Sequence, residues 1–98
     1  MQYFFLKLNP PRKTFAQDMT PDEKAIMQKH VAYWTNLMEQ GNVIAFGPVI
    51  DPAGTYGIGI VKAENNEQIE KFIEDDPANG LNHYEHFPMY AILPASSH

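Results

Sequence analysis

Apolar residues follow two different periods along the chain, and the changes of period predict six elements. Four stretches rich in aromatic and β-branched residues are typical of strands, and two stretches with apolar residues every three or four positions are typical of amphipathic helices. The predicted strands are residues 2–8, 43–50, 55–63 and 83–93, and the predicted helices are residues 20–40 and 66–75. This order predicts an α+β, ferredoxin-like βαββαβ fold with an antiparallel sheet and both helices on one face.

The ends of the elements carry local signals. Thr20-Pro21-Asp22-Glu23 has the pattern of a capping box with proline in the first helical turn, and Gly41-Asn42 predicts a left-handed stop after the helix. Asn65 or Asn66 is expected to cap the second helix. Residues 10–19 are expected to be a loop, and Pro88 predicts an edge position or a bulge for the last strand.

Both faces of the predicted sheet are apolar. In the first strand Tyr3 and Phe5 alternate with Phe4 and Leu6, so neither set is polar. Two helices cover only one face of a four-stranded sheet, and an apolar second face needs a covering layer. We therefore expect a homodimer that forms through the open sheet face.

Composition limits the function classes. The 98 residues, 44% of them hydrophobic, fit a single domain over residues 1–98 with a tail at 94–98. The chain has no cysteine, no long apolar run and no signal-peptide pattern at its start, so a cytoplasmic protein without a membrane partner is expected. The net charge is −5 and basic residues do not cluster, which argues against binding to nucleic acid.

The first predicted helix has a titratable residue in its apolar stripe. At 100° per residue, His30 falls within about 40° of Ile26, together with Tyr33 and Leu37. An imidazole in this position needs a hydrogen-bond partner. His30 is therefore a candidate site residue, with a satisfied core histidine as the alternative.

The second predicted helix ends in three acids, residues 74–76, although the C-terminal end of a helix disfavours negative charge. Asp76 continues the buried stripe of this helix, whereas the other two acids turn toward solvent. A carboxylate beside an imidazole orients the ring and stabilises its protonated form, so His30 and Asp76 are a candidate catalytic pair. Asp76-Pro77 also has the pattern of an N-cap for a turn over 77–80, and this alternative stays open.

Several other residues are candidates for substrate binding. Arg12 in the loop could hold an anionic ligand, with a solvated arginine as the alternative. Tyr33 and Trp34 could contact a substrate or belong to the core. Gly47 and Pro48 mark a strand end or a bulge, where backbone amides could bind a ligand.

Two further patterns are weaker. His83 and His86 have a spacing that resembles a pair of metal ligands, but on a strand they point to opposite faces, so no metal site is expected. "GIG" (57–59) lacks the third glycine and the following helix of a dinucleotide motif. It indicates strand glycines that permit close approach.

Three segments together resemble a YCII-related (YciI-like) protein: "MQYFFLKLNPPRKTFAQDMT", "MQKHVAYWTNLMEQGNVIAFGPVIDPAGTYG" and "DDPANGL". The resemblance implies a dimeric α+β barrel, with a site built from a histidine and an aspartate that correspond to His30 and Asp76. The wider superfamily includes muconolactone-isomerase-like enzymes and small monooxygenases. The chain departs from the family at Met27, where many relatives have arginine, and in the short stretch 78–87, which leaves the role of His83 open.

Two function classes follow. The first is a cofactor-independent enzyme, isomerase-like or lyase-like, in which His30 moves a proton on a small organic acid and Asp76 orients the imidazole. Arg12 or backbone amides near Gly47 would hold the anionic group. The alternative is a non-catalytic dimeric module for ligand binding or assembly. A monooxygenase shares the fold, but the sequence has no cofactor motif, so no cofactor is expected.

Overall fold

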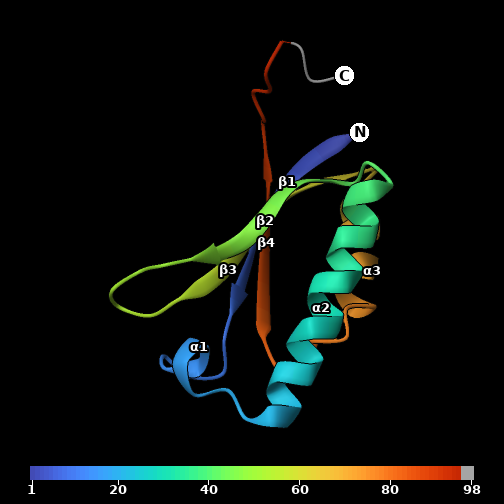
Figure 1. Cartoon of the computed structure of the whole chain (residues 1–98). Coiled ribbons are helices and arrows are strands. Elements are labelled where there is room, and N and C mark those ends of the chain that lie inside the picture. Colours follow the sequence, from blue (N-terminus) through green and yellow to red (C-terminus); the bar gives the residue numbers. More distant parts are fainter. Residues whose placement is uncertain (96–98) are drawn as a thin grey trace.

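The centre of the molecule is a four-stranded antiparallel sheet (Figure 1). The computed structural model describes residues 1–95, so residues 96–98 of the predicted tail lie outside the described residues. The strands are β1 (Gln2–Asn9), β2 (Val43–Val49), β3 (Tyr56–Ala63) and β4 (His83–Met89), and their order in the sheet is β2-β3-β1-β4. This order and the antiparallel pairing confirm the predicted ferredoxin-like fold.

The two longer helices, α2 (Pro21–Glu39) and α3 (Asn66–Glu74), lie on the same face of the sheet (Figure 1). The capping box is present, because the Thr20 side chain accepts from the Glu23 N–H at 3.1 Å and Glu23 accepts from the Thr20 N–H at 2.9 Å. After α2, Gly41 has φ +89°, which is the predicted left-handed stop. Asn65 caps α3 by accepting from the Gln68 N–H.

Three details of the prediction were wrong. The expected loop 10–19 contains a short helix, α1 (Phe15–Asp18), whose turn is closed by the Gln17 and Asp18 N–H groups on the Thr14 carbonyl. Strand β4 ends at Met89 instead of residue 93, because its pairing with β1 runs out at Tyr3.

The third correction concerns β2. Gly47 and Pro48 lie inside the strand, in register with Ile58 and Gly57 of β3, and the irregularity falls between Val43 and Ala45 instead. Pro48 is tolerated there because β2 is an edge strand, where one side of the backbone needs no ladder partner. Pro88 lies on β4, the other edge strand, as the sequence predicts.

The core fills the space between the sheet and the helices. Phe4 and Leu6 of β1 are almost fully buried, at 0% and 2% exposure, and they pack with Trp34 of α2 and Ile69 of α3. The alternate residues of β1 point to the other face, where Phe5 lies between Ile60 of β3 and Phe87 of β4. Phe87 is 53% exposed, so the apolar patch on this second face is open in the single chain, and Lys7, Lys62 and Glu85 lie on the same face.

No helix in the described part of the chain is long and apolar enough to cross a membrane.

Candidate active site

A buried hydrogen bond joins α2 to Asp76, two positions after the end of α3. His30 is 7% exposed and Asp76 is 3% exposed, and the distance between His30 Nδ1 and Asp76 Oδ2 is 2.8 Å. His30 lies on the buried side of α2, Asp76 lies just beyond α3, and both helices cover the same face of the sheet. The structure therefore brings together two residues that are 46 positions apart in the sequence.

Asp76 has a second contact that the sequence analysis treated as an alternative. Its other oxygen, Oδ1, accepts from the Ala78 N–H at 2.9 Å and so caps the turn that begins at Pro77. The two interpretations of Asp76 are therefore compatible, because a carboxylate has two oxygens that accept independently. The cap holds Oδ1 in place and leaves Oδ2 directed at His30.

Three side chains donate to the same oxygen of Asp76. Besides His30, Oδ2 accepts from Trp34 Nε1–H at 2.7 Å and from the Tyr84 hydroxyl at 2.5 Å. Burial raises the pKa of Asp76, but the hydrogen bonds from His30, Tyr84, Ala78 and Trp34 outweigh it and hold that pKa below its ordinary value. Asp76 is thus an ionised carboxylate in a buried position, with every contact made by a donor.

The ionised carboxylate determines which nitrogen of His30 carries the proton. A carboxylate only accepts hydrogen bonds, so Nδ1 must donate its N–H to Asp76. In the neutral ring, Nε2 then keeps a free lone pair. This is the arrangement in which an imidazole can take a proton from a bound molecule.

The two tyrosines near Asp76 remain protonated donors. Burial, followed by the hydrogen bond and the charge of Asp76, raises the pKa of Tyr84 far above its ordinary value. Burial and the charges of Asp75 and Asp76 raise the pKa of Tyr33 to about 12. The Tyr33 hydroxyl donates to the Phe72 carbonyl at 2.6 Å and therefore joins α2 to α3 outside the cavity.

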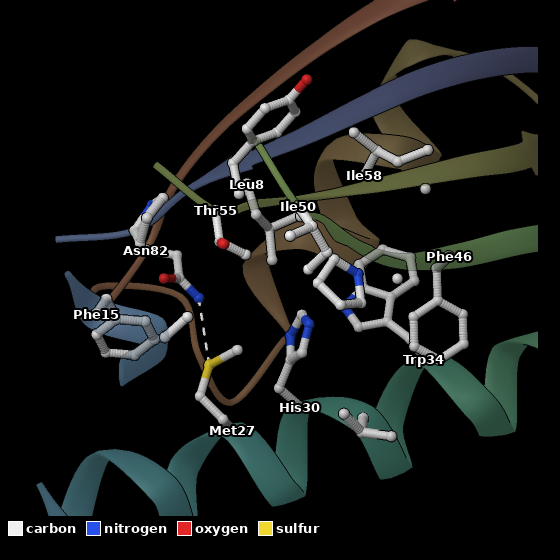
Figure 2. A pocket seen from close by; sticks show the side chains of 18 of the residues that line it. Leu8, Phe15, Met27, His30, Trp34, Phe46, Ile50, Thr55, Ile58 and Asn82 are labelled. Atoms are coloured by element: carbon white, nitrogen blue, oxygen red, sulfur yellow. Dashed lines mark hydrogen bonds between the residues drawn. The ribbon is translucent and has the colours of Figure 1, made fainter. Parts of the chain in front are cut away.

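His30 lines a cavity of about 480 Å³ between α2, the helix-facing side of the sheet and the segment around α1. Figure 2 shows the His30 ring between Met27 and Trp34, directed from α2 toward the strands, with Phe15 on one side and Phe46 on the other. The described lining contains no Lys, Arg, Asp or Glu. Its residues are Leu6, Leu8, Pro10, Phe15, Ala16, Gln17, Met19, Met27, His30, Val31, Trp34, Phe46, Gly47, Pro48, Ile50, Thr55, Tyr56, Gly57, Ile58, Gly59 and Asn82.

The candidate substrate-binding residues divide into two groups. Trp34, Gly47 and Pro48 line the cavity, whereas Tyr33 and Arg12 do not. Trp34 also contacts the candidate catalytic pair, because its indole N–H donates a hydrogen bond to Asp76.

Arg12 forms salt bridges with two acidic side chains near the start of α2, Asp18 and Glu23. Its guanidinium donates to Asp18 at 2.8 Å and, through two nitrogens, to both oxygens of Glu23 at 3.0 and 2.8 Å. Arg12 lowers the pKa of Glu23 to about 2, with help from the Thr20 N–H. Arg12 also lines a separate cavity of about 270 Å³ with Lys7 and Lys13. It therefore fastens the segment around α1 to α2, away from His30.

Sequence reasoning missed two polar residues of the site. Tyr84 lies on the helix-facing side of β4, opposite Leu8 of β1, and this position follows from strand alternation once the register is known. Asn82 precedes β4, is 7% exposed, and donates to Met27 Sδ at 3.5 Å (Figure 2). No local pattern in the sequence points to Asn82, because its burial depends on the turn that Asp76 caps.

The two histidines of β4 are apart from this site. His83 is exposed, and His86 packs edge-on against Phe4 with 6.2 Å between the ring centroids. His86 Nε2 lies 3.8 Å from Glu70. Within residues 1–95, no group of three or more His, Cys, Asp or Glu side chains is arranged to hold a metal ion.

Comparisons with known proteins agree with this fold. The sequence model of the YCII-related domain matches residues 1–92. A solved structure, 5-chloro-2-hydroxyhydroquinone dehydrochlorinase from Burkholderia phenoliruptrix in complex with 2,5-dihydroxybenzoquinone, superposes with a TM-score of 0.57. It is 22% identical in sequence, and the match covers 84% of this chain and 90% of that one. No curated protein matches the sequence.

Proposed function

The chain belongs to the YCII-related domain family, and we propose that it is a small-molecule enzyme in which His30 transfers a proton. In this proposal Asp76 is the residue that orients the ring and stabilises its positive charge. The observation that carries the proposal is the 2.8 Å contact between the two side chains at the wall of an apolar cavity. A buried, paired imidazole with a free nitrogen facing a cavity is the expected geometry of a general base.

The proposed step is the elimination of H–X or a proton shift within one molecule. Nε2 of His30 takes a proton from a C–H or O–H group, and the electron pair of that bond forms a new double bond. In an elimination, X leaves with its bonding pair as an anion. In an isomerisation, the imidazolium returns the proton to another atom of the same molecule. Asp76 remains ionised throughout, because its donors stabilise the anion.

The structural neighbour supports the elimination over the isomerisation. That enzyme is named for the loss of HCl from a hydroxylated ring, and its structure holds a dihydroxybenzoquinone. A cavity of about 480 Å³ has room for one ring of this size. The step moves no electrons to an external acceptor, so the proposed chemistry needs no redox cofactor.

Two reactions test the proposal. The first is chloride release from 5-chloro-2-hydroxyhydroquinone under anaerobic conditions, and the second is deuterium uptake by 1,2,4-trihydroxybenzene in D2O, followed by NMR. The wild type should accelerate at least one reaction over buffer, and His30→Gln should reduce the enzymatic rate by roughly 10²–10⁴-fold. Tyr33→Phe is the control, because the Tyr33 hydroxyl contacts Phe72 outside the cavity. A wild type that accelerates neither reaction would overturn the assignment.

Binding without turnover would favour the alternative, a non-catalytic module that holds a small ligand. In that case the same rings would shift the NMR signals of cavity residues, and His30→Gln would change affinity but no rate. The two functions are therefore separated by one pair of measurements on the same variant.

The open sheet face supports the further proposal of a homodimer. Phe5, Ile60 and Phe87 are neighbours on this face, and a second copy would bury them. Phe87→Glu should then shift the mass measured by light scattering from about twice 11.2 kDa to 11.2 kDa. Val31→Glu, which replaces a half-exposed apolar residue on α2, is the control and should keep the larger mass.

A further inference from the structure

Strand β3 lacks side chains at two positions on its helix-facing side. Gly57 and Gly59 occupy these positions, opposite Leu8 and Leu6 of β1, and both line the cavity beside His30. The next residues on the same face, Val61 and Ala63, carry side chains and belong to the core. At these two positions the β3 part of the cavity floor is therefore bare backbone, and it ends where the core begins.

The backbone conformation does not require glycine at either position. The glycines with positive φ in the described chain are Gly41, Gly54 and Gly80, so neither cavity glycine is in the left-handed region. A Cβ atom at Gly57 would lie 3.4 Å from Leu8 Cβ, and one at Gly59 would lie 3.6 Å from Phe46 Cβ. These are ordinary van der Waals distances, so alanine fits at both positions without displacement of a neighbour.

Two glycines in a strand interior weaken the strand, and they often mark a place where a ligand approaches the backbone closely. Both glycines line the cavity, so a methyl group on either residue would stand at its wall, beside Leu8 at position 57 or beside Phe46 at position 59. Packing and backbone geometry leave these glycines unexplained. Room for a bound molecule explains both.

The walls of the cavity indicate the chemistry of that molecule. Aromatic rings of Trp34, Phe46 and Phe15 surround the space, and apart from His30 the described lining has no basic side chain, neither Lys nor Arg, that could pair with an anion. Burial of an unpaired charge is unfavourable, and the charge of Asp76 is already matched to its donors. An uncharged, flat molecule therefore fits better than the small organic acid that the sequence analysis expected.

We infer that Gly57 and Gly59 are specificity-determining residues that admit a flat, uncharged, hydroxylated ring, such as a hydroquinone, against the backbone of β3. This inference rests on the proposed function, because it places the ring where an edge O–H or C–H group faces His30. It adds the shape and charge that the ring must have, and it names the residues that select them.

The test is an NMR titration of the 98-residue chain with hydroquinone. The amide signals of Gly57 and Gly59 and the indole signal of Trp34, the single tryptophan in the chain, should shift and saturate. Gly59→Ala should weaken binding by about tenfold or more, and Gly59→Val should weaken it further. The thermal midpoint of Gly59→Ala should stay equal or rise, because alanine fits the strand.

Two comparison ligands separate shape from charge. Cyclohexane-1,4-diol has the same hydroxyl groups on a puckered ring, and 2,5-dihydroxybenzoate adds a carboxylate to hydroquinone. Both should bind at least tenfold more weakly. Equal binding of the puckered diol would overturn the requirement for a flat ring. Tighter binding of the benzoate would overturn the requirement for an uncharged ring. Unchanged hydroquinone affinity of Gly59→Ala would overturn the role of the glycines.

The outcome is independent of the test for proton transfer. If His30→Gln leaves both reaction rates unchanged while Gly59→Ala still weakens hydroquinone binding, the proposed function is wrong. The role of the two glycines in ligand binding is then still supported. If hydroquinone does not bind but His30→Gln abolishes turnover of the chlorinated ring, the catalytic role stands and the substrate class inferred from the glycines is wrong.

Discussion

His30 and Trp34, one turn apart on α2, donate hydrogen bonds to the same carboxylate oxygen, Asp76 Oδ2, at 2.8 and 2.7 Å. Residues four positions apart lie on the same face of a helix, so both side chains reach one point. A single carboxylate therefore fixes the position of a titratable ring and of an aromatic wall of the cavity.

The ring nitrogen that carries the proton should change when the carboxylate becomes an amide. In the wild type at alkaline pH, long-range ¹H–¹⁵N NMR spectra should show the proton on His30 Nδ1. An amide oxygen carries no full charge and the NH₂ group can donate to Nδ1, so in Asp76→Asn a larger share of the neutral rings should carry the proton on Nε2, although the Trp34 indole N–H still favours an acceptor at the Oδ2 position. His83 and His86 provide internal controls and should not change. A proton on Nδ1 in both proteins would mean that the charge of Asp76 does not set the tautomer.

Loss of the Tyr84 hydroxyl should destabilise the protein more than loss of the Tyr33 hydroxyl. Tyr84 donates to a carboxylate and Tyr33 to a backbone carbonyl. Hydrogen bonds to charged groups contribute about 1.5–3 kcal/mol and neutral ones about 0.5–1.5 kcal/mol. Denaturant unfolding of Tyr84→Phe and Tyr33→Phe measures the difference, and the reverse order would contradict the assignment of an ionised Asp76.

Stability should fall as the pH falls below about 4. The pKa of Asp76 is lower in the folded protein than in the unfolded chain, so the unfolded chain binds the proton more readily. The stabilisation is fully present above the ordinary aspartate pKa of about 3.9 and is lost as the pH falls through the lower folded value. Glu23, with a pKa of about 2, contributes with the same sign.

Asp76→Asn should therefore show a smaller loss of unfolding free energy between pH 5 and pH 2 than the wild type. Salt separates the two acids. Added NaCl should weaken the contribution of the Glu23–Arg12 pair, whose arginine is 37% exposed, and should leave that of buried Asp76 largely unchanged. A pH dependence equal in the variant and the wild type would exclude Asp76 as its source.

Arg12→Gln should alter the segment around α1 without altering the chemistry of the cavity. The substitution removes the contacts to Asp18 and Glu23, so the thermal midpoint should fall slightly and amide exchange in residues 12–18 should speed up. The affinity for hydroquinone should remain within about twofold, because the Arg12 side chain does not line that cavity. A tenfold or larger loss of affinity for hydroquinone would show that Arg12 contributes to the binding site.

The sequence predicts those features that depend on residues a few positions apart in the chain. The capping box at Thr20, the stop at Gly41 and the cap at Asn65 are each encoded within a few positions, and each is present. Helix α1 was missed because it is a single turn whose C-terminal end is held by Arg12, six positions before Asp18.

The polar surroundings of Asp76 could be predicted only in part. The stripe of each helix indicates the pairing with His30, but Tyr84 comes from an edge strand whose register no local pattern fixes. Gly57 and Gly59 were interpreted as permitting close approach, and the sequence alone does not say what approaches them. The cavity depends on α1, β2 and β3 together, and only the fold brings these elements to one place.

The placement of Tyr84 on an edge strand links local breathing of the fold to the electrostatics of the site. Edge strands open more readily than central ones, and each opening of β4 removes one of the three side-chain donors on Asp76 Oδ2. The aspartate then loses a donor that favours its charged form. Solvent conditions or partners that hold β4 against β1 therefore keep Asp76 in its ionised form, although they do not touch it.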